Sequence, residues 1–296
     1  MSKKFLFALL FATRVTRLVA WLNRSQVTIL CYHSVSQQQG LVFADSHKMQ
    51  IDIQSFLRHL DYLQSNYHII SLTDFLRARR QNIALPQRAA ILTFDDGARN
   101  FLTLVAPALL ERGIPATSFI VTGENFTNER STLNGEWTPE DDNSFLSWNE
   151  VRQLADQGLE FGSHTCSHYA LPDLSAVEAR SELEKSLSML EEHLGPQKFP
   201  LSYPHGRTSA EISRLAQTLG YSCAVTTELG PNDAERDLFA LRRTVIASDD
   251  DIPTFAARLS GLTAWYSRVV PPFSARTPAT REAATLCYDQ LDELES

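Results

Sequence analysis

The sequence predicts an α/β fold built on a parallel sheet, as either a barrel or an open sheet. Short runs of β-branched and aromatic residues alternate with longer amphipathic stretches, the pattern of repeated strand–helix–strand units. Several amphipathic stretches end at a glycine, a common helix terminator. With 296 residues, 43% of them apolar, the chain can bury the core of one large domain.

Strand predictions rest on the β-branched and aromatic runs, and helix predictions on apolar residues at helical spacing. Strands are expected at residues 27–33, 68–72, 89–95, 116–122, 159–163, 201–203, 223–227 and 240–246. Helices are expected at residues 53–66, 100–112, 148–157, 176–194 and 210–219. Residues 125–143 are polar and rich in turn formers, which predicts an inserted loop.

Both ends of the chain differ from this alternating part. We assign residues 1–25 to a basic amphipathic N-terminal segment, 26–262 to the main domain and 263–296 to a peripheral C-terminal tail interrupted by prolines. The net charge of −8 argues against a nucleic-acid binder, which needs a basic face. The four cysteines form no CxxC pair, so we expect ordinary thiols.

Charged residues in the N-terminal segment are all basic. They are Lys3, Lys4, Arg14, Arg17 and Arg24. The apolar run 5–12 is shorter than the roughly 20 residues that span a bilayer. On a helix the arginines would share one face opposite aliphatic residues, which favours peripheral contact with a membrane interface, on a side of the membrane that stays open. A leading helix packed on the domain is the alternative.

The strongest chemical signal is the run Thr93-Phe94-Asp95-Asp96-Gly97, which ends an apolar strand. The chain turns there, and Gly97 permits the backbone angles that such a turn often needs. Both carboxylates can therefore point into the cleft where α/β folds place active sites. Repulsion makes such a pair costly unless a cation is present. A strand-to-helix turn with a capping aspartate is the alternative.

A second signal, His164-Thr165-Cys166-Ser167-His168, also follows a predicted strand. Two histidines four residues apart can share one face of a turn and chelate one metal. An unpaired surface or capping histidine is the ordinary alternative for either residue. Together with the aspartate pair, the histidines would complete an Asp-His-His site. Three protein ligands leave an open position for water, as a catalytic zinc requires.

These ordered motifs resemble those of the polysaccharide deacetylases with a NodB-homology domain. The first motif is matched by residues 93–97, the second by 164–168 and the third by Tyr203-Pro204-His205-Gly206. The resemblance runs from the strand with Cys31-Tyr32-His33 to about Ile246. It implies a deformed parallel (β/α) barrel and a metal-dependent hydrolase that removes N-acetyl groups from a glycan or glycolipid and releases acetate.

The resemblance also implies roles for the matching residues. Asp96, His164 and His168 would hold a divalent metal, for which zinc is expected. Asp95 would act as the base that takes a proton from the attacking water, which the metal activates.

The third motif departs from the family's usual form. Tyr203, Pro204 and His205 would line the substrate and the oxyanion, with a backbone N–H near Tyr203 as donor. The family often has an arginine before this element, but residues 199–202 contain none, and His205 stands where tyrosine is usual. Arg243 resembles an arginine of the subgroup that lacks the former one, so we expect it to orient Asp95; a surface ion pair is the alternative.

The general acid is the least direct assignment. No histidine follows His205, so the family's usual late histidine has no match. In permuted members the histidine of the first strand takes this role, which here is His33, and imidazole can change protonation near neutral pH. A buried histidine bonded inside the barrel is the alternative, and His205 is the next candidate acid.

Two other functions are compatible with the same residues. The site could hydrolyse an O-acetyl ester or a non-sugar amide, because pocket shape decides the substrate. A barrel that binds glycan without turnover is the other alternative, although both aspartates and both histidines are present.

Overall fold

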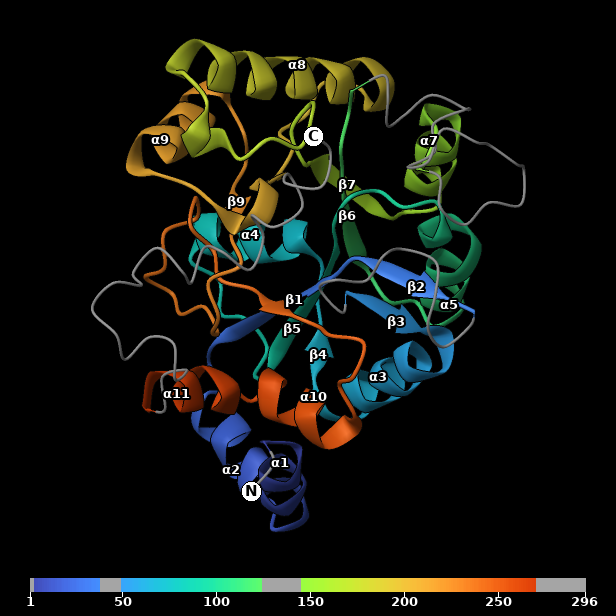
Figure 1. The fold of residues 1–296 in the computed structure, drawn as a ribbon, viewed down its shortest axis with the longest axis vertical. Helices are drawn as coiled ribbons and strands as arrows, with labels where there is room; N and C mark the ends of the chain where they lie inside the picture. Colours follow the sequence, from blue (N-terminus) through green and yellow to red (C-terminus); the bar gives the residue numbers. More distant parts are fainter. Residues whose placement is uncertain (1–2, 38–48, 124–144, 270–296) are drawn as a thin grey trace, which may run out of the picture.

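The structure is a computed structural model that describes residues 3–37, 49–123 and 145–269 (Figure 1). At its centre is an eight-stranded parallel sheet in the order β10-β1-β5-β6-β7-β8-β9, with β4 beside β5. The strands are β1 (Val27–Tyr32), β4 (His68–Ile69), β5 (Ala89–Phe94), β6 (Ala116–Ile120), β7 (Glu160–Ser163), β8 (Leu201–Ser202), β9 (Ala224–Val225) and β10 (Thr244–Val245). Each lies within a predicted strand.

The sheet curls until its two ends share one segment of chain. Leu241 bridges Val225 of β9 in parallel, and four residues later Val245 of β10 pairs with Cys31 of β1. Residues 241–245 therefore close the sheet into a deformed parallel (β/α) barrel, as predicted. Strands β1 and β5 are buried along their whole length, which explains their continuous apolar runs.

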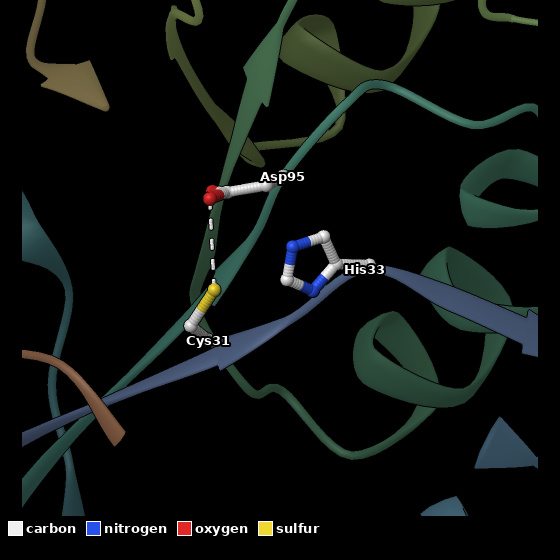
Figure 2. Close-up of side chains that lie close together, drawn as sticks. All are labelled: Cys31, His33 and Asp95. Atoms are coloured by element: carbon white, nitrogen blue, oxygen red, sulfur yellow. Dashed lines mark hydrogen bonds between the residues drawn. The ribbon is translucent and has the colours of Figure 1, made fainter. Parts of the chain in front are cut away.

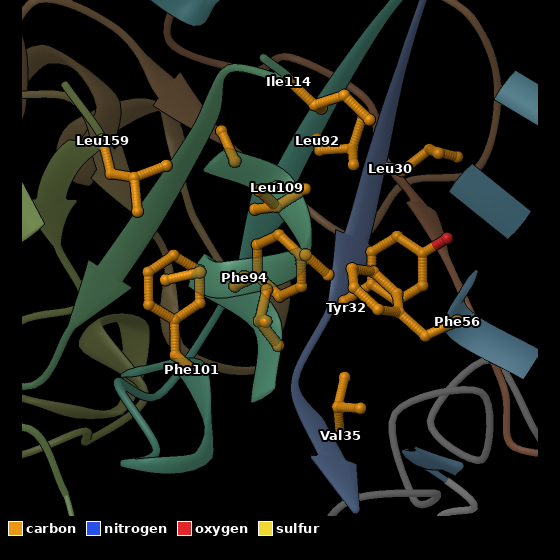
Figure 3. Close-up of a cluster of buried hydrophobic side chains, with 14 of the residues drawn as sticks. Leu30, Tyr32, Val35, Phe56, Leu92, Phe94, Phe101, Leu109, Ile114 and Leu159 are labelled. Carbon is orange, nitrogen blue, oxygen red and sulfur yellow. The ribbon is translucent and has the colours of Figure 1, made fainter. Parts of the chain in front are cut away.

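Helices cover the outside of the sheet. They are α3 (Ile53–Asn66), α4 (Leu72–Gln81), α5 (Ala106–Glu111), α7 (Trp148–Asp156), α8 (Ala176–Leu194), α9 (Ala210–Leu219) and α10 (Ile252–Leu259). The largest apolar cluster of the described residues lies between the sheet and α3, α5, α7, α8 and α10 (Figure 3). There the Tyr32 ring of β1 stacks on Phe94 of β5 at 5.3 Å between centroids, and Phe56 of α3 packs edge-on against both.

Some elements differ from the prediction. The helix expected at 100–112 divides into a π-helical turn, η1 (Phe101–Val105), and α5. The strand expected at 68–72 ends early because the Ser71 side chain accepts from the Asp74 N–H and starts α4. A short pair, β2 (Ser34–Ser36) with β3 (Gln50–Asp52), was not expected, nor was α10.

The N-terminal segment forms two helices, α1 (Lys3–Ala12) and α2 (Val15–Leu22). They pack on α10 and on α11 (Leu262–Val269), where Phe7 is buried with Ala257 and Leu262. The tail predicted from residue 263 therefore begins inside a packed helix; residues 270–296, Cys287 and the predicted loop at 125–143 lie outside the described residues. No single described helix is long and apolar enough to cross a bilayer, and the α1–α2 pair that reaches this limit jointly is bent by 80°.

Candidate active site

The chemical residues gather at the C-terminal ends of neighbouring parallel strands. Asp95 and Asp96 follow β5, and His164 follows β7. The Asp95 N–H donates to the Tyr32 carbonyl of β1, and the His164 N–H donates to the Ile120 carbonyl of β6. The hydrogen bonds between parallel strands therefore continue into the two motifs. At Gly97 a Cβ atom would lie 2.9 Å from Ile120 Cγ2, and φ is +78°. The sequence needs glycine there for both reasons.

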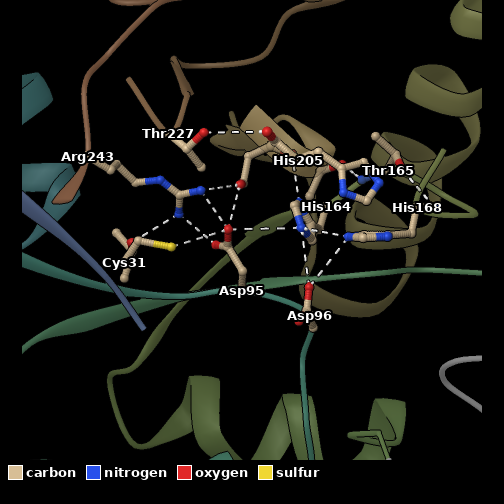
Figure 4. A network of polar contacts seen from close by, with 12 residues as sticks. Cys31, Asp95, Asp96, His164, Thr165, His168, His205, Thr227 and Arg243 are labelled. Atoms are coloured by element: carbon tan, nitrogen blue, oxygen red, sulfur yellow. Dashed lines mark hydrogen bonds and ion pairs between the residues drawn. The ribbon is translucent and has the colours of Figure 1, made fainter. Parts of the chain in front are cut away.

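Asp96, His164 and His168, which we call the ligand trio, present three ligand atoms to one point, the ligand point (Figure 4). Asp96 Oδ1 lies 3.4 Å from His164 Nε2 and 3.5 Å from His168 Nε2, and the two Nε2 atoms are 3.2 Å apart. Ligand atoms about 2.0–2.1 Å from one tetrahedral zinc ion are separated by roughly 3.3–3.4 Å. The donor set and its spacing therefore fit the predicted metal.

Hydrogen bonds outside the ligand trio orient the rings. His164 Nδ1 lies 2.8 Å from the Ser202 carbonyl, to which it donates when Nε2 carries the lone pair that faces Asp96. Such a partner is typical of a metal-binding histidine. The backbone is turned to unusual angles around the trio, with positive φ at Asp96, Thr165 and His168. Strained backbone of this kind is concentrated at functional sites.

Asp95 is surrounded differently from its neighbour. Its oxygens accept two parallel hydrogen bonds from Arg243, Nη1 to Oδ1 at 2.7 Å and Nη2 to Oδ2 at 2.6 Å. Oδ2 also accepts from the Ser202 hydroxyl at 3.1 Å, and the Cys31 thiol lies 3.6 Å away. Arg243 is fully buried, so the structure does not place it in a surface ion pair.

Two of the three proposed ligands are in the state that binds a metal, whereas the third, His164, must lose a proton. Burial lowers the pKa of His164, but Asp95 and Asp96 outweigh it and raise this pKa, so metal binding would displace a proton from the ring. Burial would raise the pKa of Asp95, but the Arg243 guanidinium and the His164 ring outweigh it and lower this pKa to about 2. The pKa of Asp96 is likewise held far below its usual range, against burial, by its hydrogen bond with His164 and by nearby rings. Burial and the His164 ring lower the pKa of His168 to about 4. Two carboxylates and a neutral His168 therefore face the ligand point at neutral pH.

His33 directly follows β1 and lies close to Cys31 and Asp95 (Figure 2). Its Nδ1 is buried and has no hydrogen-bond partner within the described residues. Cys31, His33 and Asp95 also offer three donor atoms within 4.8 Å of one another, but Asp95 is already engaged by Arg243. Burial raises the pKa of the Cys31 thiol well above its ordinary value, which argues against a thiolate ligand.

The third motif is divided by the structure. The His205 ring lies against His168, with centroids 4.9 Å apart. The Tyr203 side chain instead points into the core and donates from its hydroxyl to the Phe239 carbonyl. The Tyr203 N–H donates to Val225, and Pro204 has no N–H. The structure therefore does not bring the polar groups of Tyr203 or Pro204 toward the ligand trio.

Two residues that support the site were not singled out in the sequence. Ser202 bridges Arg243 and Asp95 with its hydroxyl. Glu182 of α8 accepts the N–H groups of Cys166 and Ser167 at 3.0 and 2.8 Å and so holds the histidine loop. Both are common residue types with no motif around them, so the only signal in the sequence was the position of Ser202 directly before the third motif.

Comparison with known proteins gives a consistent result. Residues 82–224 match the family model described as Polysaccharide deacetylase. The chain is 24% identical over 247 residues to YxkH of Bacillus subtilis, named as a candidate polysaccharide deacetylase, covering 82% of this chain and 80% of that protein. It is 25% identical over 270 residues to the poly-beta-1,6-N-acetyl-D-glucosamine N-deacetylase of Escherichia coli K12, covering 81% of this chain but only 39% of that protein.

Among solved structures, a deacetylase of Streptococcus pyogenes, PplD, in complex with acetate has the same fold. The TM-score is 0.67 and the identity 22%, over 79% of this chain and 98% of the other.

Proposed function

Because the chain belongs to the polysaccharide deacetylase family, we propose that it removes N-acetyl groups from an amino-sugar-containing glycan and releases acetate. The observation that supports this most directly is the ligand trio, whose three donor atoms lie 3.2–3.5 Å apart beside a second carboxylate, Asp95, which is held by Arg243. The trio supplies the ligands that a catalytic metal requires, and Asp95 supplies the general base that hydrolysis requires beside that metal.

In this proposal Asp96, His164 and His168 hold a divalent metal, with zinc expected from the nitrogen-rich set. When bound, the metal supplies Lewis acidity to the acetyl carbonyl and to water. Asp95 takes the proton of the attacking water at a carboxylate oxygen. Arg243 and Ser202 keep that carboxylate ionised and fixed in direction, because both donate hydrogen bonds to it.

We assign the general acid to His33. Its ring lies beside Asp95 (Figure 2), and the residue is only half-buried, so we expect the ring to reach a substrate bound at the trio. A proton given from this ring to the departing amine would complete cleavage of the amide bond. His205, against His168, is then a residue of the substrate cleft.

The test is acetate release from poly-β-1,6-N-acetylglucosamine and from chitooligosaccharides by the purified full chain. Zinc-loaded protein should release acetate, whereas metal-stripped protein and the Asp95→Asn variant should be at least about 10²-fold slower. Asp74→Asn, an exchange of an exposed aspartate on α4, is the matched control. Release from an aryl acetate ester but from no N-acetylated glycan would show an esterase instead, and failure to bind zinc would remove the site assignment.

We also propose peripheral membrane contact through residues 1–25. The support is the exposed basic and apolar surface of α1 and α2.

A further inference from the structure

Helix α2 exposes three large apolar side chains on one face. Leu18, Trp21 and Leu22 are 57%, 50% and 60% exposed, and their spacing of three and four residues places them side by side on a helix. The same helix buries Thr16 and Ala20 on the side toward the domain. A contiguous apolar group of this kind is typical of a surface that binds something.

Positive charge borders this apolar group. Arg14 and Arg17 are exposed, and the Arg24 guanidinium lies over the Trp21 ring, 4.3 Å from its centroid. No acidic residue occurs before Asp45, although the whole chain carries a net charge of −8. Lys4 of α1 is paired with Asp249, so the positive charge beside the apolar group comes from the arginines. A basic region with exposed Trp and Leu matches the chemistry of a helix that lies in an anionic lipid interface.

We infer that the docking face, formed by Leu18, Trp21 and Leu22 with Arg14 and Arg17, binds an anionic lipid surface and holds the active site pointing away from it. The inference rests on the proposed function only where it concerns the substrate. The docking itself depends on charge and apolar exposure alone.

The orientation follows from the strand next to α2. The Arg24 carbonyl, two residues after α2, accepts a hydrogen bond from the Arg88 N–H at 2.6 Å. Arg88 immediately precedes β5, and Asp95 immediately follows it. The six residues of β5 span about 20 Å at ~3.3 Å per residue. Figure 1 shows α1 and α2 at one end of the molecule, with α10 and α11 between them and the sheet.

Because the site lies at the opposite end of β5 from the membrane, only a substrate that extends that far from the lipid surface can enter it. A single N-acetylated sugar on a lipid of the same bilayer would lie at the wrong end of the molecule. A glycan chain in solution, or one that extends well beyond about 20 Å from the surface, can enter the site while the protein stays bound. The expected substrate is therefore a polymer rather than a short glycolipid.

Docking is tested by sedimentation of the full chain with vesicles of phosphatidylglycerol and phosphatidylcholine, beside phosphatidylcholine alone. Binding should need the anionic lipid and weaken as salt rises. Leu18→Gln combined with Trp21→Gln should weaken it at least about tenfold, and Arg17→Gln about fivefold. Val177→Gln, at an apolar residue 78% exposed on α8, and Lys185→Gln should leave binding unchanged.

Orientation is tested by hydrogen exchange on the same vesicles. Protection should appear in α1 and α2 and be absent from residues 95–97 and 164–169. Acetate release by vesicle-bound protein should be fast on soluble polymer and at least about tenfold slower on an embedded lipid with one N-acetylated sugar.

Each adverse result contradicts a different part of the inference. Binding that ignores lipid charge, or a docking face occupied by a second copy of the chain, overturns the lipid assignment. Protection at residues 164–169, or equal cleavage of the glycolipid, overturns the orientation. Absence of acetate from both substrates contradicts the proposed function, while sedimentation and exchange still decide the docking.

Discussion

Asp95 and Asp96 are adjacent in sequence but have opposite partners. Asp95 is closed in by an arginine and a serine, whereas Asp96 faces two imidazoles. A φ of +74° at Asp96 turns the chain so that both side chains reach the same cleft, although residues of a regular strand would alternate. One carboxylate is thus available as a ligand and the other as a base.

We predict that Arg243→Lys slows acetate release more than tenfold, because one ammonium cannot form the two parallel bonds of a guanidinium. The pKa of Asp95, now about 2, should rise, so the acidic limb of the kcat/KM profile should move to higher pH. Arg242→Lys is the matched control, since Arg242 pairs with Glu228 instead. An unmoved acidic limb would show that Arg243 does not set the state of Asp95.

At the scale of the elements, helix α8 supports the site without supplying a ligand, because its side chains hold the loop that carries the two histidines. Its Glu182 accepts two backbone N–H groups of the histidine loop, and its Ser186 contacts Ser163 at the end of β7 at 2.7 Å. The loop therefore takes its shape from a helix that binds no metal.

We predict that Glu182→Gln weakens zinc affinity about 10–100-fold, the range found when an outer partner of a metal site is lost. A neutral amide accepts the two N–H groups less strongly than a carboxylate. Competition with a chromophoric chelator measures the affinity. Glu184→Gln, on the same helix but paired with Arg180, should bind zinc as the unaltered chain does, and equal affinities in the two variants would contradict the role of Glu182.

Helices α3 and α10 meet at a buried histidine. The His59 ring stacks on Phe255 with centroids 3.8 Å apart, and its Nε2 lies 3.1 Å from the Asp250 carbonyl. Burial lowers the pKa of His59 to about 4 from its ordinary 6.5, so the ring is neutral in the folded protein at neutral pH.

We predict that this ring makes the domain acid-sensitive. The unfolded chain binds a proton at His59 below pH 6.5 but the folded chain only near pH 4, so stability falls between these values, by roughly 3 kcal/mol in total. His59→Gln should have lower stability at pH 7 but a shallower loss on acidification to pH 4.5, measured by denaturant unfolding. Parallel losses in both proteins would assign the acid sensitivity to other groups.

Element by element, the sequence predicted what depends on local pattern. All eight strands of the sheet and the ligand motifs could be found from apolar runs and their endings. Helix α4 was missed because its apolar residues continue directly from β4, and the break is made by the Ser71 cap. Ser202 and Glu182 were missed because their partners lie in other parts of the chain, and only the folded barrel brings them together.

At the scale of the molecule, the proposed metal site joins strands that are far apart in sequence. The proposed ligands follow β5 and β7, and the proposed base, Asp95, is held by Arg243 beside β10. A metal that binds only the folded arrangement stabilises the whole domain by mass action.

We predict that zinc removal lowers the melting temperature by roughly 5–10 °C. Free zinc at 100 times its dissociation constant contributes about 2.7 kcal/mol, and a domain of this size shifts by about 2–4 °C per kcal/mol. Calorimetry with and without a chelator measures the shift. His164→Ala should melt at one temperature in both conditions. An identical shift in that variant would place the stabilising ion elsewhere.

The last strand of the barrel also has a consequence for synthesis. A nascent chain that has emerged as far as β9 already contains Asp96, His164 and His168, but not Arg243, which follows β9 and lies beside β10. Until residues 241–245 join β1, Asp95 lacks its buried counter-ion. Synthesis therefore produces the three proposed metal ligands before the partner of the proposed base, so in the proposed function zinc binding precedes the ability to cleave glycan.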